Sequence, residues 1–362
     1  MHKPELRLQA PLACAVAAPR APEARIARQL RASTALRILL QATAWSGVSI
    51  SVAMVSPASA NPTGGAVVAG KATIDQADPN RTVINQASDR AAINWQSFSI
   101  GANQYTVFYQ PSASSVALNR VTGPDPSTIA GHLQANGNVI LVNPNGVVFS
   151  QGSQVNVHGL VATTSDIQNS DFMAGRFNFS IPSPNAGATV VNEGTITVAD
   201  QGLAALVAPG TQNSGIINAR FGRVMLAGAQ TFTVDLYGDG LLSFDVGSKV
   251  KGASVTNTGE IHADGGVIQL QASAVDDIVT GVINLGGLVS ANTLVTQTGT
   301  VIADAGASGQ LNVPGQVEAR GANPGETGGN VTLTGGSVAV TGTVDASGSA
   351  GGGTIKVGGG FH

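Results

Sequence analysis

The sequence predicts an all-β protein: a right-handed, single-stranded parallel β-helix, or solenoid, with an N-terminal β cap. Two observations carry this prediction. Glycine is abundant, with 47 residues among 362, while aromatic residues make up only 4%, which suits many short aliphatic strands joined by tight turns. In addition, a polar residue followed by x-Gly-x-Ile/Val recurs along the chain, and a repeat of about 20 residues in a strand-rich chain is typical of a solenoid.

Residues 1–60 are predicted to be an extended signal peptide that is removed. An apolar run without charge covers residues 38–55, and three arginines precede it. Small residues at Ala58 and Ala60 follow, which is the A-x-A pattern of a signal-peptidase site. We therefore expect cleavage after Ala60, leaving Asn61 as the first residue, with a transmembrane anchor as the alternative. The long stretch before the run leaves two explanations open, an extended signal peptide or a true start further downstream.

Charge and cysteine usage exclude several classes of function. Seven of the 18 basic residues but two of the 21 acidic residues precede Ala60, so the remainder carries 11 basic and 19 acidic side chains. A nucleic-acid-binding body needs clustered Lys and Arg, and this acidic remainder argues against one. The single cysteine, Cys14, lies in the segment expected to be removed. The mature chain would therefore have no disulfide framework, thiol nucleophile or thiolate metal site, and packing must stabilise it.

The recurring pattern places its glycines at intervals of 21, 44, 40 and 43 residues, close to one or two multiples of 21. Weaker copies surround Gly238, Gly281 and Gly315. We expect each coil to supply two or three strands that pair with the next coil, with aliphatic side chains stacked inside and Gly or Asn at the corners. The fixed frame of a leucine-rich repeat is absent, and a β-sandwich is the alternative. The full copies are Asn192–Ile196, Asn213–Ile217, Asn257–Ile261, Gln297–Val301 and Val340–Val344.

Residues 61–135 lack the repeat and are predicted to form the N-terminal cap. An open solenoid exposes strand edges at its ends, so it needs caps. This region is rich in aromatic residues, and we expect it to pack over the first coil. No polar cap is evident at the other end, where the sequence stops within the repeat pattern, which suggests a longer protein. The aromatic residues are Trp95, Phe98, Tyr105, Phe108 and Tyr109.

One long stretch, from residue 92 to residue 179, carries a family resemblance. It contains INWQSFSIG, VFYQPSASSVALNRVTG, STIAGHLQANGNVILVNPNGVVFSQGSQVNVHGLVATTSDI and FMAGRFNF. These segments closely resemble the secretion domain of filamentous-haemagglutinin-like and high-molecular-weight-adhesin-like exoproteins, also called the haemagglutination activity domain. The motifs are long and ordered. The later segment GTVDASGSAGGGTIKVGG also resembles the passenger repeats of that family.

The resemblance implies an exoprotein of two-partner secretion that crosses the inner membrane by the Sec machinery. Its N-terminal domain would bind the POTRA domains of a cognate outer-membrane β-barrel transporter, and the chain would fold outside a Gram-negative cell. We expect a secreted or surface-exposed adhesin that binds a host-cell glycan or receptor, with residues 61–240 as secretion domain and residues 241–362 as the first passenger repeats. The alternatives are the export module of a larger contact-dependent toxin or haemolysin, or a carbohydrate-active β-helix enzyme.

The family's NPNG motif maps onto Asn143, Pro144, Asn145 and Gly146. Taken by itself, this tetrapeptide predicts a β-turn, because proline fixes φ, the second Asn tolerates the bridge or left-handed region, and glycine closes the turn. Apolar runs on both sides are expected to be strands. The motif is predicted to act in folding and in recognition by the transporter, with a purely structural corner as the alternative. An NPNL-type motif is not visible, which favours the high-molecular-weight-adhesin-like branch.

No catalytic residue, cofactor or metal site is predicted. His132, His158 and His262 are the histidines of the body, and none stands in an HxH, HxxxH or HExxH arrangement. Acidic turns at Gly238–Gly240 and Asp276–Asp277 lack the sequence of a calcium loop. Polysaccharide-cleaving enzymes need charged side chains that converge on one groove, whereas the 11 basic residues after Ala60 are scattered. We therefore predict that the protein is not an enzyme.

Overall fold

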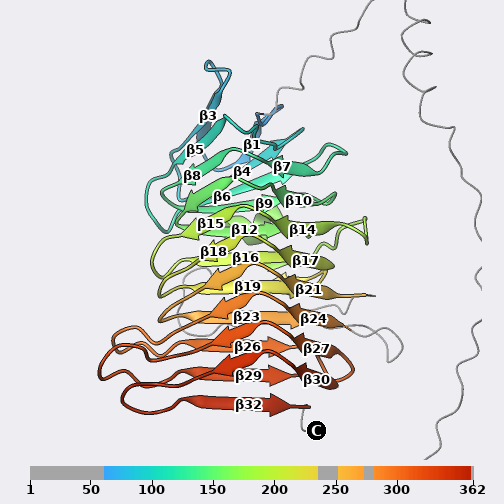
Figure 1. The fold of residues 1–362 in the computed structure, drawn as a ribbon. Helices are drawn as coiled ribbons and strands as arrows, with labels where there is room; N and C mark the ends of the chain where they lie inside the picture. Colours follow the sequence, from blue (N-terminus) through green and yellow to red (C-terminus); the bar gives the residue numbers. More distant parts are fainter. Residues whose placement is uncertain (1–60, 235–251, 273–280, 360–362) are drawn as a thin grey trace, which may run out of the picture. The chain divides into compact units, whose positions relative to one another are not determined.

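A computed structural model describes residues 61–234, 252–272 and 281–359. The chain divides into two units, Met1–Val55 and Ser56–His362, and all described residues lie in the second. Most of the strands are parallel and stack into three long sheets (Figure 1). Because one chain passes from sheet to sheet and returns one strand further along, the prediction of a parallel β-helix is confirmed. Within the described residues, no helix is long and apolar enough to cross a membrane.

The three sheets collect strands from successive coils. Sheet 1 has 11 strands, in the order β1 (Ala66–Ala69), β4 (Arg90–Trp95), β6 (Val116–Val121), β9 (Asn138–Val142), β12 (Gly159–Thr163), β16 (Leu203–Ala208), β19 (Arg223–Gly228), β23 (Val267–Ala272), β26 (Thr300–Asp304), β29 (Asn330–Thr334) and β32 (Thr354–Gly358). Sheet 2 has eight strands, in the order β7 (Ser127–Ile129), β10 (Val147–Phe149), β14 (Thr189–Asn192), β17 (Gly210–Asn213), β21 (Ser254–Asn257), β24 (Val282–Leu285), β27 (Gln310–Val313) and β30 (Ser337–Val340). Sheet 3 has 11 strands, in the order β2 (Ala72–Asp75), β3 (Arg81–Gln86), β5 (Tyr105–Tyr109), β8 (His132–Ala135), β11 (Gln154–Val157), β15 (Thr195–Val198), β18 (Ile216–Asn218), β22 (Glu260–His262), β25 (Leu288–Ser290), β28 (Gln316–Glu318) and β31 (Thr343–Asp345).

From β5 to β30, each coil runs from sheet 3 to sheet 1 and then to sheet 2. The register is continuous from coil to coil; Leu160, for example, lies between Val139 of the preceding coil and Ala204 of the following one. One core of buried side chains, most of them aliphatic, fills the space between the three sheets from Ile84 to Leu333. Alternation along each strand produces this core, because every second residue points inward and is almost always Val, Ile, Leu or Ala.

A column of buried asparagines fixes the corner between sheets 2 and 3. Asn192, Asn213 and Asn257 occupy the last positions of β14, β17 and β21. The Nδ2 of Asn192 donates to Oδ1 of Asn213 at 2.7 Å, and the Nδ2 of Asn213 donates to Oδ1 of Asn257 at 2.7 Å. The next coil has Leu285 at this place, where the column ends. These amides satisfy one another in a buried site where an unpaired polar group would be destabilising.

The glycines of the repeat form two columns, not one. In the column between sheets 2 and 3, a Cβ added to any glycine after the first would lie 1.9–2.3 Å from the carbonyl oxygen of the glycine before it, so only glycine fits. Gly299 belongs to a different corner, before sheet 1, where Gly329 faces its carbonyl oxygen. The expected uniform period of 21 residues is therefore wrong beyond the first pair, because the later corners are longer. The first column is Gly194, Gly215, Gly259, Gly287, Gly315 and Gly342.

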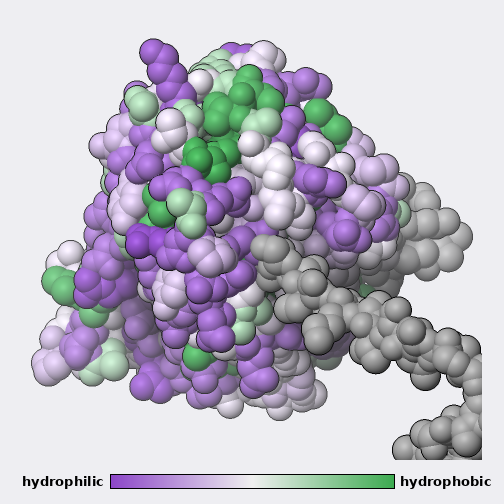
Figure 2. Space-filling model, turned by 90° about the horizontal axis from the view of Figure 1, so that it is seen from above, coloured by the Kyte–Doolittle hydropathy of each residue, from purple (hydrophilic) through white to green (hydrophobic). Residues whose placement is uncertain are grey.

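The N-terminal end is closed by two antiparallel strands. β1 pairs antiparallel with β4 and β2 pairs antiparallel with β3, whereas within the three long sheets the pairs from β3 and β4 onward are parallel. Figure 2 shows hydrophobic residues gathered among hydrophilic ones on the surface seen from above. Trp95, Phe98 and Phe108 lie inside the first coils, where Trp95 packs edge-on against Phe98 at 5.5 Å, whereas Tyr105 and Tyr109 are exposed. The expectation that the aromatic region packs over the first coil therefore needs correction, since β1 and β2 form the cap.

A segment outside the helix covers one face of sheet 1. Residues 164–188, here called the cover, leave the coil after β12 and contain α2 (Asn169–Met173) and β13 (Asn178–Phe179). β13 pairs with β20 (Phe232–Thr233), which leaves the helix two coils later. Between the cover and sheet 1 lies a second apolar core. Its members from the cover are Ile167, Phe172, Phe177 and Phe179, and those from sheet 1 include Leu118, Ile140, Val142, Val161 and Met225.

Candidate functional site

The NPNG motif forms the corner between β9 and β10. β9 is fully buried because both of its faces pack, one against the main core and one against the second core. The chain then turns through the four motif residues and enters sheet 2 as β10. The corner therefore lies where sheet 1 meets sheet 2, which is also the corner from which the cover leaves in the next coil.

Two hydrogen bonds within the motif make the turn that the sequence predicts. The backbone N–H of Gly146 donates to the carbonyl oxygen of Asn143 at 3.0 Å, and the N–H of Asn145 donates to Oδ1 of Asn143 at 2.9 Å. Gly146 has φ +114°, and a Cβ there would meet the carbonyl oxygen of Thr189 at 3.0 Å. Among the described non-glycine residues, positive φ occurs at Gln201, Phe221 and Val295, so Asn145 does not adopt the left-handed conformation.

The asparagine side chains tie the turn to the preceding coil. The Nδ2 of Asn143 donates to the carbonyl oxygen of Asp125 at 3.0 Å and to Oγ of Ser127 at 3.0 Å. The Nδ2 of Asn145 donates to the carbonyl oxygen of Gly123 at 3.1 Å. Asn143 is 0% exposed, so both its donor and its acceptor are used inside the protein.

The other side of the turn contacts the cover. The hydroxyl of Ser183 donates to the carbonyl oxygen of Pro144 at 2.7 Å, and the same Oγ accepts the N–H of Asn185 at 3.0 Å. Pro144 and Asn145 are half-buried, and they are the motif residues that retain accessible surface. The four predicted residues are therefore brought together in one turn, which is hydrogen-bonded to the 122–127 loop on one side and to the cover on the other.

Arg120 anchors the cover, and sequence reasoning did not single it out. Its Nε donates to both carboxylate oxygens of Asp166, at 2.8 and 2.7 Å. Its guanidinium also donates to the carbonyl oxygen of Ile167 at 2.8 Å and to Oδ1 of Asn169 at 3.1 Å. The Arg120 side chain is only 14% exposed. A signal existed in the sequence, because a lone arginine stands in the otherwise uncharged strand VALNRV, and such a buried charge needs a partner.

The other predicted residues lie apart from this corner. Ala60 lies outside the described residues, whereas Asn61 is buried and its Nδ2 donates to the carbonyl oxygen of Pro79 at 2.6 Å. The ring of His132 stacks on Tyr105 at 4.4 Å, and His262 contacts Glu260 at 2.9 Å. In the part of the chain that the structure describes, no three His, Cys, Asp or Glu side chains group as metal ligands. The acidic turns at 238–240 and 276–277 lie outside that part.

Comparison with known proteins gives a consistent family match. Residues 58–319 match the TPS secretion domain family. The solved HMW1 secretion domain from Haemophilus influenzae superposes with a TM-score of 0.70 at 30% identity, covering 80% of this chain and 74% of that one. The filamentous hemagglutinin secretion domain superposes with a TM-score of 0.55 at 17% identity, covering 82% and 99% of the two chains, which supports the fold alone.

Two curated relatives carry the same name. A heme/hemopexin-binding protein of Haemophilus influenzae is 36% identical over 211 residues, which are 56% of this chain and 23% of the relative. A second Haemophilus influenzae protein of that name is 43% identical over 113 residues, which are 31% of this chain and 12% of the relative. The chain thus spans less than a quarter of the length of these relatives.

Proposed function

The chain belongs to the TPS secretion domain family, and from this premise we propose that residues 61–240 are the export signal and folding nucleus of an adhesin-like exoprotein. Exoproteins of this family are secreted across the outer membrane of Gram-negative bacteria and interact with a cognate transporter. The observation that carries the proposal is the family match over residues 58–319. The second core beneath the cover supports the nucleus role, because it adds buried apolar area to the first coils of an otherwise repetitive fold.

The proposed partners act in order along the export route. The Sec machinery takes the chain across the inner membrane, and signal peptidase cleaves after Ala60. The POTRA domains of the transporter then bind the secretion domain, which works by binding and not by catalysis. Cleavage at this place would leave Asn61 as the first residue, next to the strands that close the helix. Terminal sequencing of the secreted protein tests the cleavage, and a retained apolar run would contradict it.

The NPNG corner is proposed to act mainly by positioning the surface that the transporter recognises. Asn143 and Gly146 are buried, so they cannot contact a partner of the folded domain. The side chains of Asn143 and Asn145 instead fix the 122–127 loop, and the carbonyl oxygen of Pro144 binds the cover. Pro144 and Asn145 keep accessible surface at the centre of these elements. A change in the corner would therefore move the surface on both sides of it.

Substitution of Asn145 tests this role. We expect Asn145→Val to reduce secretion by a co-expressed transporter, because it removes the hydrogen bond to Gly123 and places a β-branched residue within a turn. Asn143→Val with Asn145→Val should have a larger effect, since the loss of the Asn143 amide also leaves the Ser127 hydroxyl and the backbone N–H of position 145 without the partner they have in the wild type. Asn103→Ala, an exposed loop asparagine, is the matched control. Synthesis and signal cleavage should be unchanged in all variants.

Three measurements on each variant separate the outcomes: secreted amount, circular dichroism of the purified protein, and binding to purified POTRA domains. A variant that folds but binds the POTRA domains weakly supports recognition through this corner. A variant that does not fold shows a structural corner. Secretion of the double variant at the unmodified level would overturn the assignment of the motif, and wild-type protein that never binds the POTRA domains would overturn the proposed function itself.

A heme or hemopexin ligand is a second candidate for the complete exoprotein. It is favoured by the 36% identity with a heme/hemopexin-binding protein over 211 residues. Two measurements on the secreted protein separate this candidate from the adhesin. Surface plasmon resonance measures its binding to hemopexin, and a cell assay measures its adhesion to epithelial cells. A toxin would instead carry an activity domain beyond His362, with an immunity gene beside it, and reading the locus tests that alternative.

A further inference from the structure

The outer face of sheet 3 carries exposed aromatic and amide side chains over the first coils. Tyr105 and Tyr109 are 40% and 51% exposed and stand at the two ends of β5, whose three middle residues are buried. Outward positions on one strand that are four residues apart lie about 13 Å from one another. The exposed amides Asn85 and Asn156 stand on β3 and β11 of the same sheet. Two exposed aromatic rings and two exposed amides thus share sheet 3 over the first coils.

Neighbouring side chains hold both tyrosine rings in place. The ring of His132 lies parallel to that of Tyr105, with centroids 4.4 Å apart and an interplanar angle of 8°. The Nη2 of Arg81 donates to the hydroxyl of Tyr109 at 3.1 Å. Rings that are already fixed lose little conformational freedom when a ligand binds to them. Both tyrosines are therefore preorganised as a platform.

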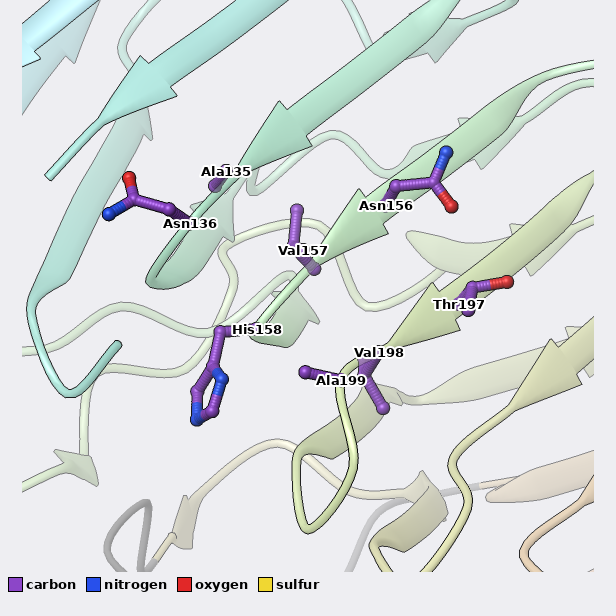
Figure 3. Close-up of a pocket in the computed structure, with 8 residues that line it drawn as sticks. All are labelled: Ala135, Asn136, Asn156, Val157, His158, Thr197, Val198 and Ala199. Atoms are coloured by element: carbon purple, nitrogen blue, oxygen red, sulfur yellow. The ribbon is translucent and has the colours of Figure 1, made fainter. Parts of the chain in front are cut away.

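A groove of about 300 Å³ opens one coil further along, at the ends of β8, β11 and β15 (Figure 3). Its polar lining includes Asn136, Asn156, His158 and Thr197. The Asn136 amide also binds the residue next to Tyr109, because its Oδ1 accepts the N–H of Gln110 at 2.7 Å and its Nδ2 donates to the Gln110 carbonyl at 2.8 Å. The groove thus begins beside the tyrosine platform.

We propose that this platform and groove bind a neutral oligosaccharide of two or three rings. The C–H face of a sugar ring packs against the negative face of an aromatic ring, and amide and imidazole groups can pair with its hydroxyls. No acidic side chain occupies an outward position of β3, β5, β8, β11 or β15. Arg81 is the only lysine or arginine on these five strands, and its guanidinium already donates to the Tyr109 hydroxyl. This deepens the adhesin part of the proposed function, on which it rests, by naming the residues that would contact a glycan.

In the test, the purified secreted protein is titrated with maltotriose, cellotriose and triacetylchitotriose, and binding is monitored by NMR. A glycan array tests the same protein against other glycans. We expect saturable binding of at least one neutral glycan, weakened about tenfold or more by Tyr109→Ala. Tyr109→Phe keeps the ring and should bind within about threefold of wild type. Ile216→Ala is the matched control, because Ile216 is 37% exposed on the same sheet but lies outside the groove. Circular dichroism confirms that each variant is folded.

Two results would overturn the proposal. One is the lack of saturable binding to any neutral glycan by the folded protein. The other is binding restricted to sulfated glycans and lost in high salt, which would indicate an ionic contact. Secretion and POTRA binding are measured on the same variants. If Tyr109→Ala lowers POTRA binding while glycan binding is unchanged, the face belongs to the transporter interface, and the proposed export function stands while the saccharide site falls.

Discussion

The outer face of sheet 1 differs between the two halves of the β-helix. In one column of paired residues, Ile140, Val161, Ala205 and Met225 are buried and apolar, and the residues that continue the column are Gln269, Ile302, Thr332 and Lys356. The first four lie beneath the cover or beside it in the second core, whereas the later positions are more exposed. Among the described residues, the early coils are thus packed on both faces of sheet 1, and the later coils on one.

This difference suggests that the early coils act as a folding nucleus, to which the later coils add. A coil packed on one face depends on its neighbours for most of its buried area, as in other solenoids. The early coils add contacts between segments far apart in the sequence, such as β13 with β20 and Arg120 with Asp166. A chain that emerges from a transporter unfolded would gain its first stable structure where both kinds of contact occur together. The family match begins with this covered half.

Removal of a ring from the second core should produce the largest loss of stability. Phe179 is 0% exposed and stacks on Phe232, with ring centroids 4.4 Å apart. We expect Phe179→Ala to lower the free energy of unfolding by about 3–5 kcal/mol in urea titration. Ile302→Ala, in the later coils of the same sheet, should lower the free energy of unfolding by less than about 1 kcal/mol. Equal losses at both positions would remove the distinction between the halves.

Removal of the buried cation should have the next largest effect. Arg120→Ala leaves Asp166 without its partner in a site where both side chains are less than a quarter exposed, and we expect a loss of about 3 kcal/mol. Arg176 provides the control, since its pair with Asp171 is at the surface with the arginine 64% exposed. Arg176→Ala should change stability by about 0.5 kcal/mol or less. A similar loss for the two variants would mean that Arg120 does not anchor the cover.

The asparagine column should contribute less to stability than Phe179 or Arg120. It also allows early and later coils to be compared at the corners of the helix. Asn213 donates and accepts within the buried column, and we expect Asn213→Ala to cost about 2 kcal/mol. Asn312 makes one bond of similar length to Asn284, at 2.9 Å, but in a half-exposed position. Asn312→Ala should cost less than about 1 kcal/mol. Thermal unfolding of the two variants measures the difference, and the reverse order would contradict it.

The smallest expected effect concerns a carboxylate, Glu326, in the later coils. Hydrogen bonds from the Asn323 side chain and backbone, with a further bond from the Val295 N–H, lower the pKa of Glu326 below its ordinary value of 4.5. The charged form is therefore favoured in the folded state, so its contribution is complete above pH 4.5 and is lost as pH falls through the folded pKa. Glu326→Gln should flatten the acid limb of stability against pH slightly. An unchanged acid limb would show that these bonds are equally present in the unfolded chain.

The sequence predicted the fold class well because the β-helix follows from local rules. Short aliphatic strands, glycine at close corners and asparagine at turns are each visible without knowledge of distant contacts. The coil length was not predictable in the same way, because glycines of two different corners share one local pattern, as Gly259 and Gly299 show. Only the pairing of strands separates those corners.

The candidate site was predicted in part. The turn at Asn143–Gly146 follows from its own residues, and the structure brings all four together. Its links to Gly123 and Ser183 involve residues 22 and 39 positions away, and no local pattern signals them. The cover was missed for a related reason: its apolar residues lack a strand or helix period of their own and acquire meaning only against the outer face of sheet 1.

Hydrogen exchange along the secreted protein tests the central claim most directly, namely that the covered coils form the stable nucleus and the later coils add to it. The account predicts that amides of β9, β12, β16 and β19 exchange slowest and together, that those of β26 and β29 exchange faster, and that Phe179→Ala removes much of this difference. Equal protection along the whole helix, or slowest exchange in β26 and β29, would contradict the account.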